Sequence, residues 1–412
     1  MTTKIFESIE LHNWRQFANV TLDFHPRMTI LTGANGAGKT TILHILNRHW
    51  GWDIPYVSAP QLTRKGPSTY WSGFWPDEET RPAPLPGQPQ HQIGWIKYAG
   101  HGSARLTVPV DVEETYAVRI DPQPRLRGVY VPSHRPVYIH QKVDQIPTTV
   151  DAREQIFEVY MNEIRKRWQI NTRVTSPSFM LKRSLISLAT FGYGNQTVVP
   201  SEQARSTFEG FQRTLLTILP KTLGFNRLLI RVPDVVLETE SGTFSLDAVS
   251  GGVAALIDIA WQVFLYSTLE ENFVVVIDEP EAHLHPELQR SVLPDLLRAF
   301  PQAQFIVATH NPLVVGSEKD SAVYVLGYDE DRRVHSEVLD QVNKAGTANE
   351  LLRDVLGLDS TSAVWVEDSV REILERYRDK ELTRGTLEEL RGDLRRLGLS
   401  KYLPTVIDNI EQ

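Results

Sequence analysis

Residues 33–40 constrain the fold of this 412-residue chain more than any other stretch of it. Their letters, GANGAGKT, match G-x-x-x-x-G-K-[ST] and lie between an apolar strand-like run, residues 28–31, and a helical pattern, residues 41–47. Glycines at these places let backbone amides curl around phosphate oxygens, and the start of the helix adds partial positive charge. In such a loop Lys39 reaches the β- and γ-phosphates, and Thr40 places its hydroxyl on Mg²⁺. The stretch therefore predicts an α/β fold that binds ATP and Mg²⁺.

A second stretch, residues 273–279, places two carboxylates at the end of an apolar run. Its letters, FVVVIDE, are typical of a buried parallel strand that delivers acids to the edge where α/β proteins bind ligands. After a phosphate-binding loop, we expect Asp278 to hold Mg²⁺ through water and Glu279 to act as general base on the attacking water. His310 follows the next apolar strand, residues 305–308, within reach of the γ-phosphate or that water. Taken alone, an acid pair more often marks a plain strand end, and a lone histidine is more often structural.

Ser250, Gly251 and Gly252 form a third candidate phosphate site, before the helical apolar pattern of residues 254–265. Ser250 can cap this helix, and the two glycines expose its first amides. The loop at residues 33–40 already surrounds the β-phosphate of a nucleotide. A second anion site in the same chain makes sense if it closes on the nucleotide that another subunit holds. The alternative interpretation is an ordinary helix cap.

The rest of the chain divides by its hydrophobic pattern. Residues 5–31 and 93–131 alternate as strands do, and residues 50–92 between them read as a Pro- and Gly-rich irregular insertion. Residues 152–219 have a helical period, and residues 273–308 read as strand, helix and strand, which implies a right-handed parallel crossover. Residues 347–412 read as charged helices without sustained heptads. We expect boundaries that divide the chain into residues 1–131, 132–227, 228–330 and 331–412.

The net charge of −8, from 43 Lys and Arg against 51 Asp and Glu, argues against a chain that coats nucleic acid over its whole surface. The charge is uneven, however, since residues 151–231 carry twelve basic and six acidic side chains. Residues 313–412 carry fourteen basic and twenty-one acidic ones. The first of these stretches predicts a site for DNA or a partner protein, with a solvated helix face as the alternative. This basic segment, residues 153–183, contains Arg153, Arg165, Lys166, Arg167, Arg173, Lys182 and Arg183.

Cysteine is absent, which excludes a disulfide scaffold, a thiolate zinc site and a cysteine nucleophile. Residues 1–16 lack the basic start and apolar run of a secretory signal, and no stretch approaches about 18 uncharged apolar residues. We therefore expect a cytoplasmic protein with no membrane contact.

The order of these motifs resembles that of ATP-binding-cassette (ABC) ATPase heads. The runs IELHNWRQF at residues 9–17, DEPEAHLHP at residues 278–286 and ATHNP at residues 308–312 are similar to the RecF, SMC and OLD branch. Transporter cassettes usually carry a Ser-Ala-Leu-Asp type turn after the catalytic glutamate, so a transporter is the least favoured member of the superfamily. The resemblance covers about half the chain.

This resemblance implies a P-loop fold with a mixed sheet, an antiparallel β lobe, an inserted helical lobe and a helical C-terminal tail. It also implies a homodimer or higher homo-oligomer in which each ATP lies between the P-loop of one head and the signature loop of another. Asp278 and Glu279 match the Walker B acids and His310 matches the switch histidine. The nucleotide contacts that it implies are Arg15, Asn35, Gly36, Gly38, Lys39, Thr40, Thr41, Ser250, Gly251 and Gly252.

Two details of the resemblance are less regular. Val249 and Val253 flank the signature where the commonest form has Leu before it and Gln or Lys after it. The γ-phosphate-sensing glutamine, which also binds Mg²⁺, should open the helical lobe, where PSHRP at residues 132–136 resembles OLD-like proteins. Gln141 is the nearest glutamine, and Arg135 has the alternative interpretation of a surface arginine.

Length narrows the choice within the branch. SMC heads are separated by hundreds of residues of coiled coil, whereas 210 residues without heptads lie between Lys39 and Ser250. Many OLD-like proteins append a TOPRIM nuclease, but too few residues follow Glu367 to complete one. We therefore expect an ATPase of the OLD/PtuA/AriA-like group, a DNA-related sensor or scaffold in defence against phage that works with a separately encoded effector nuclease.

Two other functions stay open at this point. One is a RecF-like DNA repair ATPase that clamps DNA without an effector. The other is a non-hydrolysing assembly protein whose bound ATP only locks the oligomer. This hypothesis predicts that ATP turnover is near zero in the native chain and that Glu279→Gln does not change it.

Overall fold

The structure is a computed structural model of the chain. It describes residues 4–61, 69–75, 83–87, 89–110, 112–135, 138–148, 152–170, 176–267, 271–340, 344, 346–355, 362–378 and 383–410. By their internal contacts the residues fall into two compact units, Met1–Leu351 and Leu352–Gln412.

The first unit is built on an 11-stranded sheet with the order β10-β8-β7-β1-β2-β18-β17-β3-β16-β15-β11. Strands β11, β15, β16, β3 and β17 run parallel, and every residue of β3, β15 and β16 is buried. Strands covered on both faces read as continuous apolar runs, which is why the sequence marks them so clearly. These parallel strands are β3 (Met28–Gly33), β11 (Gly128–Val131), β15 (Phe273–Asp278), β16 (Ala303–Ala308) and β17 (Ala322–Tyr328).

The other half of the sheet is antiparallel. β1 pairs with β2 and β7, β7 pairs with β8, and β8 pairs with β10. β18 (Val334–Val338) lies between the halves, antiparallel to β17 and parallel to β2. The mixed α/β sheet with an antiparallel lobe is thereby confirmed. The antiparallel strands are β1 (Phe6–Trp14), β2 (Phe17–Asp23), β7 (Gln90–Tyr98), β8 (Gly102–Pro109) and β10 (Arg119–Asp121).

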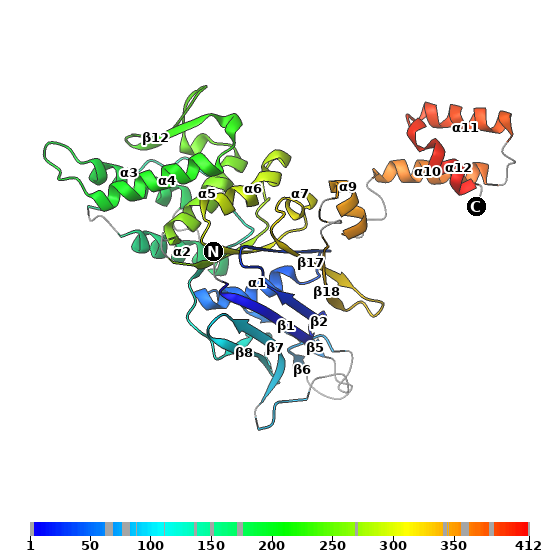
Figure 1. The fold of residues 1–412 in the computed structure, drawn as a ribbon, viewed down its shortest axis with the longest axis horizontal. Coiled ribbons are helices and arrows are strands. Elements are labelled where there is room, and N and C mark those ends of the chain that lie inside the picture. The colour runs from blue at the N-terminus through cyan, green and yellow to red at the C-terminus, as the bar shows by residue number, and fades with distance from the viewer. Residues whose placement is uncertain are drawn as a thin grey trace. The chain divides into compact units, whose positions relative to one another are not determined.

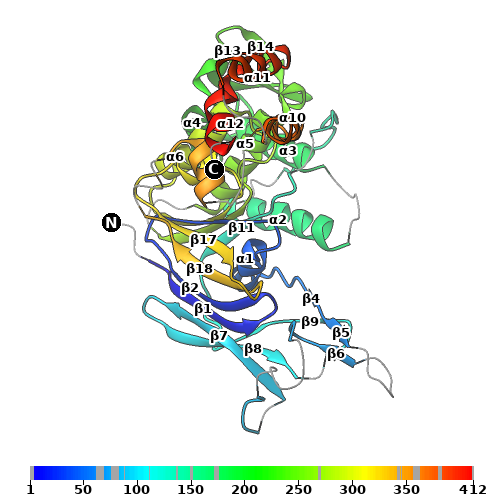
Figure 2. The ribbon, with the colours of Figure 1, turned by 90° about the vertical axis from the view of Figure 1, so that its right-hand side faces the viewer.

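A group of helices covers the β11 end of the sheet, away from β7 and β8 (Figure 2). Phe211 and Trp261 form part of its core, with ring centroids 4.7 Å apart and a steep interplanar angle. A three-stranded sheet, β12-β13-β14, adjoins these helices. The helices are α2 (Arg153–Ile170), α3 (Pro177–Tyr193), α4 (Glu202–Ile218), α5 (Gly251–Tyr266) and α6 (Pro286–Ala299), and the strands are β12 (Phe225–Arg231), β13 (Asp234–Thr239) and β14 (Gly242–Ser245).

The insertion expected to be irregular over residues 50–92 contains short strand pairs and the start of β7. β4 (Tyr56–Val57) pairs with β9 (Thr115–Tyr116), and β5 (Ala59–Gln61) pairs with β6 (Thr69–Trp71). Trp75 Nε1 donates to the carbonyl of Asn13 at 2.8 Å, so the insertion packs on the tip of the β1–β2 hairpin. Much of the proline-rich part, residues 76–82, lies outside the described residues.

The first unit continues past the boundary expected after residue 330. That boundary falls inside the β17–β18 hairpin, and the unit extends to Leu351. The strand β18 was missed because it has the letters VHSEV, which lack an apolar run.

The second unit is helical, as the sequence indicates. It contains α10 (Val364–Tyr377), α11 (Arg384–Arg396) and α12 (Leu403–Ile410), whose apolar faces form a core of their own (Figure 1). Asp393 accepts hydrogen bonds from Arg376 and Tyr377, both at 3.0 Å. Among the helices of the described residues, none has the length and apolar character needed to cross a membrane.

Candidate functional site

The loop between β3 and α1 (Lys39–Asn47) is shaped by its glycines. Gly36 and Gly38 have φ values of 82° and 95°, in the left-handed region that side chains disfavour. A Cβ on Gly38 would also lie 2.4 Å from Gln16 Nε2, because the tip of the β1–β2 hairpin packs on the loop. Lys39 Nζ donates to the carbonyl of Gly33 at 2.8 Å, so its ammonium lies across the loop. The result is a tight turn at the start of a helix, with an ammonium close to it, which is the arrangement that binds phosphates.

The β1–β2 hairpin tip brings two further side chains to this loop. Arg15 has φ of 50°, as a two-residue hairpin turn requires, and Gln16 Nε2 donates to the carbonyl of Gly36 at 3.3 Å. The Arg15 guanidinium donates to the carbonyl of Val57 at 3.0 Å and lies 4.6 Å from the ring centroid of Phe74. The Arg15 side chain therefore packs against the insertion, and Gln16 makes the hydrogen bond to the loop. Gln16 is a contact that the sequence did not single out.

Asp278 ends β15 next to the first turn of α1. Its Oδ2 accepts a hydrogen bond from Thr40 Oγ1 at 3.1 Å, and the residue is 4% exposed. Burial raises the pKa of Asp278 to about 6, and the hydrogen bond from Thr40 opposes that shift. A carboxylate and a hydroxyl are oxygen ligands of the kind that Mg²⁺ takes, so the chemistry of this pair fits the ion. Asn35 is exposed at the tip of the loop, and Thr41 is half-buried in the first turn of α1.

Glu279 and His310 meet at the carboxyl ends of two neighbouring strands. Glu279 has φ of 47°, and its N–H donates to the carbonyl of Ala308 at 2.9 Å. Its side chain is 41% exposed, with Oε1 at 3.2 Å from His310 Nδ1. Glu281 lies behind them, where it accepts a hydrogen bond from Thr309 and burial raises its pKa. An exposed carboxylate beside an imidazole can take a proton from a water molecule.

Arg135 is buried behind this pair. Its Nη2 lies 3.4 Å from the carbonyl of Asp278 and 3.2 Å from that of Glu279, and Nη1 donates to the carbonyl of Pro132. Burial lowers the pKa of Arg135, and the nearby carboxylate of Asp258 on α5 opposes the shift. Asp258 in turn accepts a hydrogen bond from Tyr160 of α2. The surface interpretation of Arg135 is therefore wrong: its guanidinium holds the backbone at the acid pair.

Ser250 caps α5, and its Oγ accepts a hydrogen bond from the amide of Val253 at 3.4 Å. A Cβ on Gly251 would meet no atom within 4 Å, whereas one on Gly252 would lie 3.0 Å from the carbonyl of His283. The first turn of α5 is thus open on the Gly251 side and closely packed on the Gly252 side. Within the described residues, no hydrogen bond joins this cap to residues 33–40. The cap is therefore open to an anion that the P-loop of its own chain does not hold.

Gln141 is an exposed residue beside an ionic cluster that forms around the buried Lys182 on the helical lobe. Its backbone carbonyl accepts a hydrogen bond from Lys182 Nζ, which also pairs with Asp247 and, at 3.1 Å, with Asp234. His140 Nδ1 lies 3.1 Å from Asp247 Oδ2, so two acids and an imidazole converge here. The Lys182 ammonium already supplies their positive partner. In the described part of the chain the Gln141 side chain has no hydrogen bond to Asp278 or Thr40, and its role as a Mg²⁺ ligand stays a prediction.

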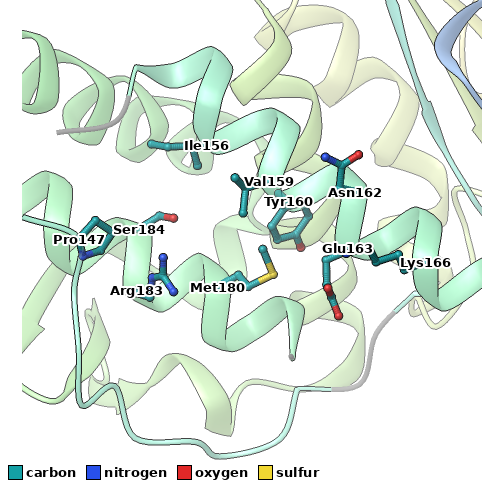
Figure 3. A pocket seen from close by; sticks show the side chains of 10 residues that line it. All are labelled: Pro147, Ile156, Val159, Tyr160, Asn162, Glu163, Lys166, Met180, Arg183 and Ser184. Carbon is teal, nitrogen blue, oxygen red and sulfur yellow. The ribbon is translucent and has the colours of Figure 1, made fainter. Parts of the chain in front are cut away.

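The basic segment does not form one continuous face. Lys182 is 0% exposed, Arg153 packs over the ring of Phe264, and Arg165 and Arg167 lie 3.7 Å from Glu158 and Glu163 respectively. Arg173 lies outside the described residues. Lys166 and Arg183 are exposed, and both line a cavity of about 370 Å³ between α2 and α3 (Figure 3). The sequence could not reveal the burial of Lys182 and the packing of Arg153, because Asp234, Asp247 and Phe264 are distant along the chain.

Two family profiles match the chain. One is described as "AAA domain" and covers residues 8–55, and the other is described as "AAA domain, putative AbiEii toxin, Type IV TA system" and covers residues 185–316. Together they include the P-loop, the signature, the acid pair and His310. Over these residues the chain is similar to AAA-family ATPases.

Two kinds of protein are among the curated relatives of this chain. The chain is 29% identical to the Septu protein PtuA of Bacillus thuringiensis over 167 residues, which are 36% of this chain and 42% of the relative. It is also 29% identical to the Retron Ec83 probable ATPase of Escherichia coli over 147 residues, 32% of this chain and 27% of the relative. The chain thus spans less than half the length of these relatives. Among solved structures, the SMC head domain from Thermotoga maritima matches with a TM-score of 0.42 and 13% identity, over 82% of this chain and 99% of that one.

Proposed function

We propose that this ATPase binds MgATP on its P-loop and hydrolyses it between two heads. The observation that supports this most directly is the position of Glu279. Its exposed carboxylate lies 3.2 Å from His310 at the same sheet edge where Thr40 and Asp278 meet 3.1 Å apart. A nucleotide site, a Mg²⁺ site and a base for water therefore lie at adjacent strand ends.

Each of these residues has a role in hydrolysis. Lys39 and the loop amides bind the β- and γ-phosphates, and Thr40 and Asp278 hold the ion, which neutralises phosphate charge when it is bound. Glu279 orients the attacking water and accepts its proton. His310, with its Nδ1 3.2 Å from Glu279 Oε1, keeps the carboxylate turned towards the water.

The signature completes the site from a second subunit. Its open first turn at Gly251 offers helix amides to a γ-phosphate carried by another copy. This arrangement makes the functional form a homodimer or a higher homo-oligomer, with two nucleotides at each pair of heads.

At the cellular level, we infer that this ATPase acts in defence against phage as a sensor or scaffold for a separately encoded effector nuclease. The relation to a Septu protein and a retron ATPase supports this inference. The cavity lined by Lys166 and Arg183 is the part of the basic segment that we assign to DNA or to the partner. It offers cations that no acid of the described residues neutralises through an ion pair.

Replacement of Glu279 by Gln tests the hydrolytic role. The variant should bind ATP as the native chain does. Its rate of ATP hydrolysis should fall by at least about 100-fold, since general base catalysis contributes about 10²–10⁴-fold. ATP should then trap a dimer that size-exclusion chromatography resolves. Glu287→Gln, an acid on α6 outside the site, is the matched control. If the native chain and Glu279→Gln hydrolyse ATP at the same measurable rate, the base assignment is wrong. If the native chain itself shows turnover near zero and Glu279→Gln changes nothing, the ATP-locked assembly hypothesis is supported instead.

A further inference from the structure

A second charged cavity lies in the helical lobe. It has a volume of about 490 Å³ and is lined by residues of α4, the ends of α5 and α6, and the first residue of α2. This volume is within the range of about 300–1,000 Å³ that is usual for small-ligand sites. Three arginines contribute to its wall: Arg153, Arg213 and Arg298.

This cavity is distinct from the nucleotide site. Residues 299–302, which line it, directly precede β16, and Ser267 follows α5 before β15. Asp278 and His310 instead follow the carboxyl ends of the same two parallel strands. The two sites therefore lie at opposite edges of the sheet, and the cavity takes no part in the chemistry at Glu279.

Arg153 forms the inner wall. Its guanidinium carbon lies 4.0 Å from the ring centroid of Phe264, and Nη2 donates to Ser267 Oγ at 2.7 Å. Its Nε is buried with no hydrogen-bond partner among the described residues, and none of the acids described there forms an ion pair with it. Burial lowers the pKa of Arg153 to about 10, and the nearby charge of Glu154 opposes this shift.

Two exposed arginines form the rim. The side chains of Arg213 on α4 and Arg298 on α6 are 68% and 67% exposed. Arg213 lies 4.0 Å from Glu209, and Arg298 pairs with Asp295. Each guanidinium has five N–H donors, so one carboxylate neighbour leaves donors for a ligand. The wall therefore carries three cations and two neighbouring acids.

We propose that this cavity binds a phosphate group, carried either by a polynucleotide backbone or by a free polyphosphate compound. Guanidinium groups match phosphate oxygens through paired N–H donors, and a dianion or diester would provide the partner that Arg153 lacks. Phe264 packs against the Arg153 guanidinium, which limits the conformational freedom of that side chain. The assignment does not depend on ATP hydrolysis.

The test uses the full chain carrying Lys39→Ala, which removes phosphate binding at the P-loop. Inorganic triphosphate and a 20-nucleotide single-stranded DNA are titrated by calorimetry and by fluorescence anisotropy. The test variant is Arg213→Gln with Arg298→Gln, two exposed changes that should leave the fold intact, and Arg153→Gln is examined beside it. The control, Arg384→Gln with Arg391→Gln, removes the same charge from two exposed positions on α11 that line neither cavity.

The rim variant should weaken binding of at least one probe about tenfold or more, because each charge-assisted hydrogen bond to phosphate is strong. The control should not weaken that same probe. Loss for both probes identifies a site that takes DNA, and loss for triphosphate alone identifies a free polyphosphate compound. Equal binding in the rim variant and in its Lys39→Ala parent overturns the assignment, as does an equal loss of binding in the control variant.

Discussion

Arg135 connects the acid pair to the helical lobe through a single side chain. Its donors bind the carbonyls of Asp278 and Glu279, while its charge faces Asp258. Glu279 has φ of 47°, a strained conformation that persists only where neighbours hold it. Because Tyr160 donates to Asp258, any shift of α2 against α5 acts on this arginine. Arg135 is therefore a positioning residue for the base, not a group that touches the nucleotide.

Arg135→Lys should lower kcat for ATP about 10- to 100-fold and change KM little, because a displacement of about 1 Å at the reacting groups costs on that order. A lysine keeps the charge beside Asp258 but cannot bond two carbonyls with one planar fork. Steady-state kinetics and nucleotide binding measure the two effects separately. Arg165→Lys, on the surface of α2, should behave as the native chain does. An unchanged kcat in Arg135→Lys, or a loss explained wholly by KM, would show that the guanidinium does not position the base.

At the scale of the element, α1 carries a titratable group in an unusual setting. Burial lowers the pKa of His44 to about 4, and its ring packs edge-on against Tyr130 with centroids 6.4 Å apart. His49, in the turn that follows α1, has its pKa lowered to about 4 by burial as well. Both imidazoles are therefore neutral in the folded chain at pH values where the unfolded chain already protonates them.

This difference makes the P-loop helix sensitive to acid. The stability that a neutral His44 contributes is complete above the unfolded pKa of 6.5 and is lost as the pH falls from 6.5 towards 4. At pH 5 the loss is about 1 to 2 kcal/mol for this residue. His44→Phe should remove that part of the pH dependence in urea unfolding between pH 7 and pH 5. The exposed His101→Phe should leave the slope as it is, and an equal slope in His44→Phe would contradict the assignment.

The sequence predicted those elements whose information is local. The P-loop is a contiguous motif with a strand before it and a helix after it. β15 and β16 are apolar runs, so their order also led to the expectation that His310 lies within reach of the γ-phosphate or the attacking water. What escaped prediction depends on distant partners. Lys182 reads as a surface cation until Asp234 and Asp247 are folded against it, and Arg135 reads as a loop residue until β15 covers it. The strand β18 has no apolar run that would mark it in the sequence. Its place in the sheet depends on pairing with β2 and β17.

At the scale of the whole molecule, the two halves of the proposed site are carried at different places on one head. Lys39 begins α1, directly after the loop that follows β3, and Gly251 begins α5 on the helical lobe. If each ATP lies between the P-loop of one subunit and the signature of another, each site takes its two halves from different chains. A substitution in either half then disables the site to which that half belongs. The symmetry of such a dimer makes this testable by mixing.

Lys39→Ala and Gly251→Asp should each abolish ATP hydrolysis alone. The first removes the phosphate-binding ammonium, and the second places a carboxylate where the γ-phosphate of the other subunit must lie. Gly251→Asp should still fold, because a Cβ there meets no atom within 4 Å. In an equimolar mixture about half of the dimers pair the two variants, and each of these has one intact site, so about a quarter of the native rate should return. Gly392→Asp, at a similarly open position on α11, should leave the rate unchanged. If mixing restores no activity while the variants still form dimers, the signature does not act on the nucleotide of the other subunit.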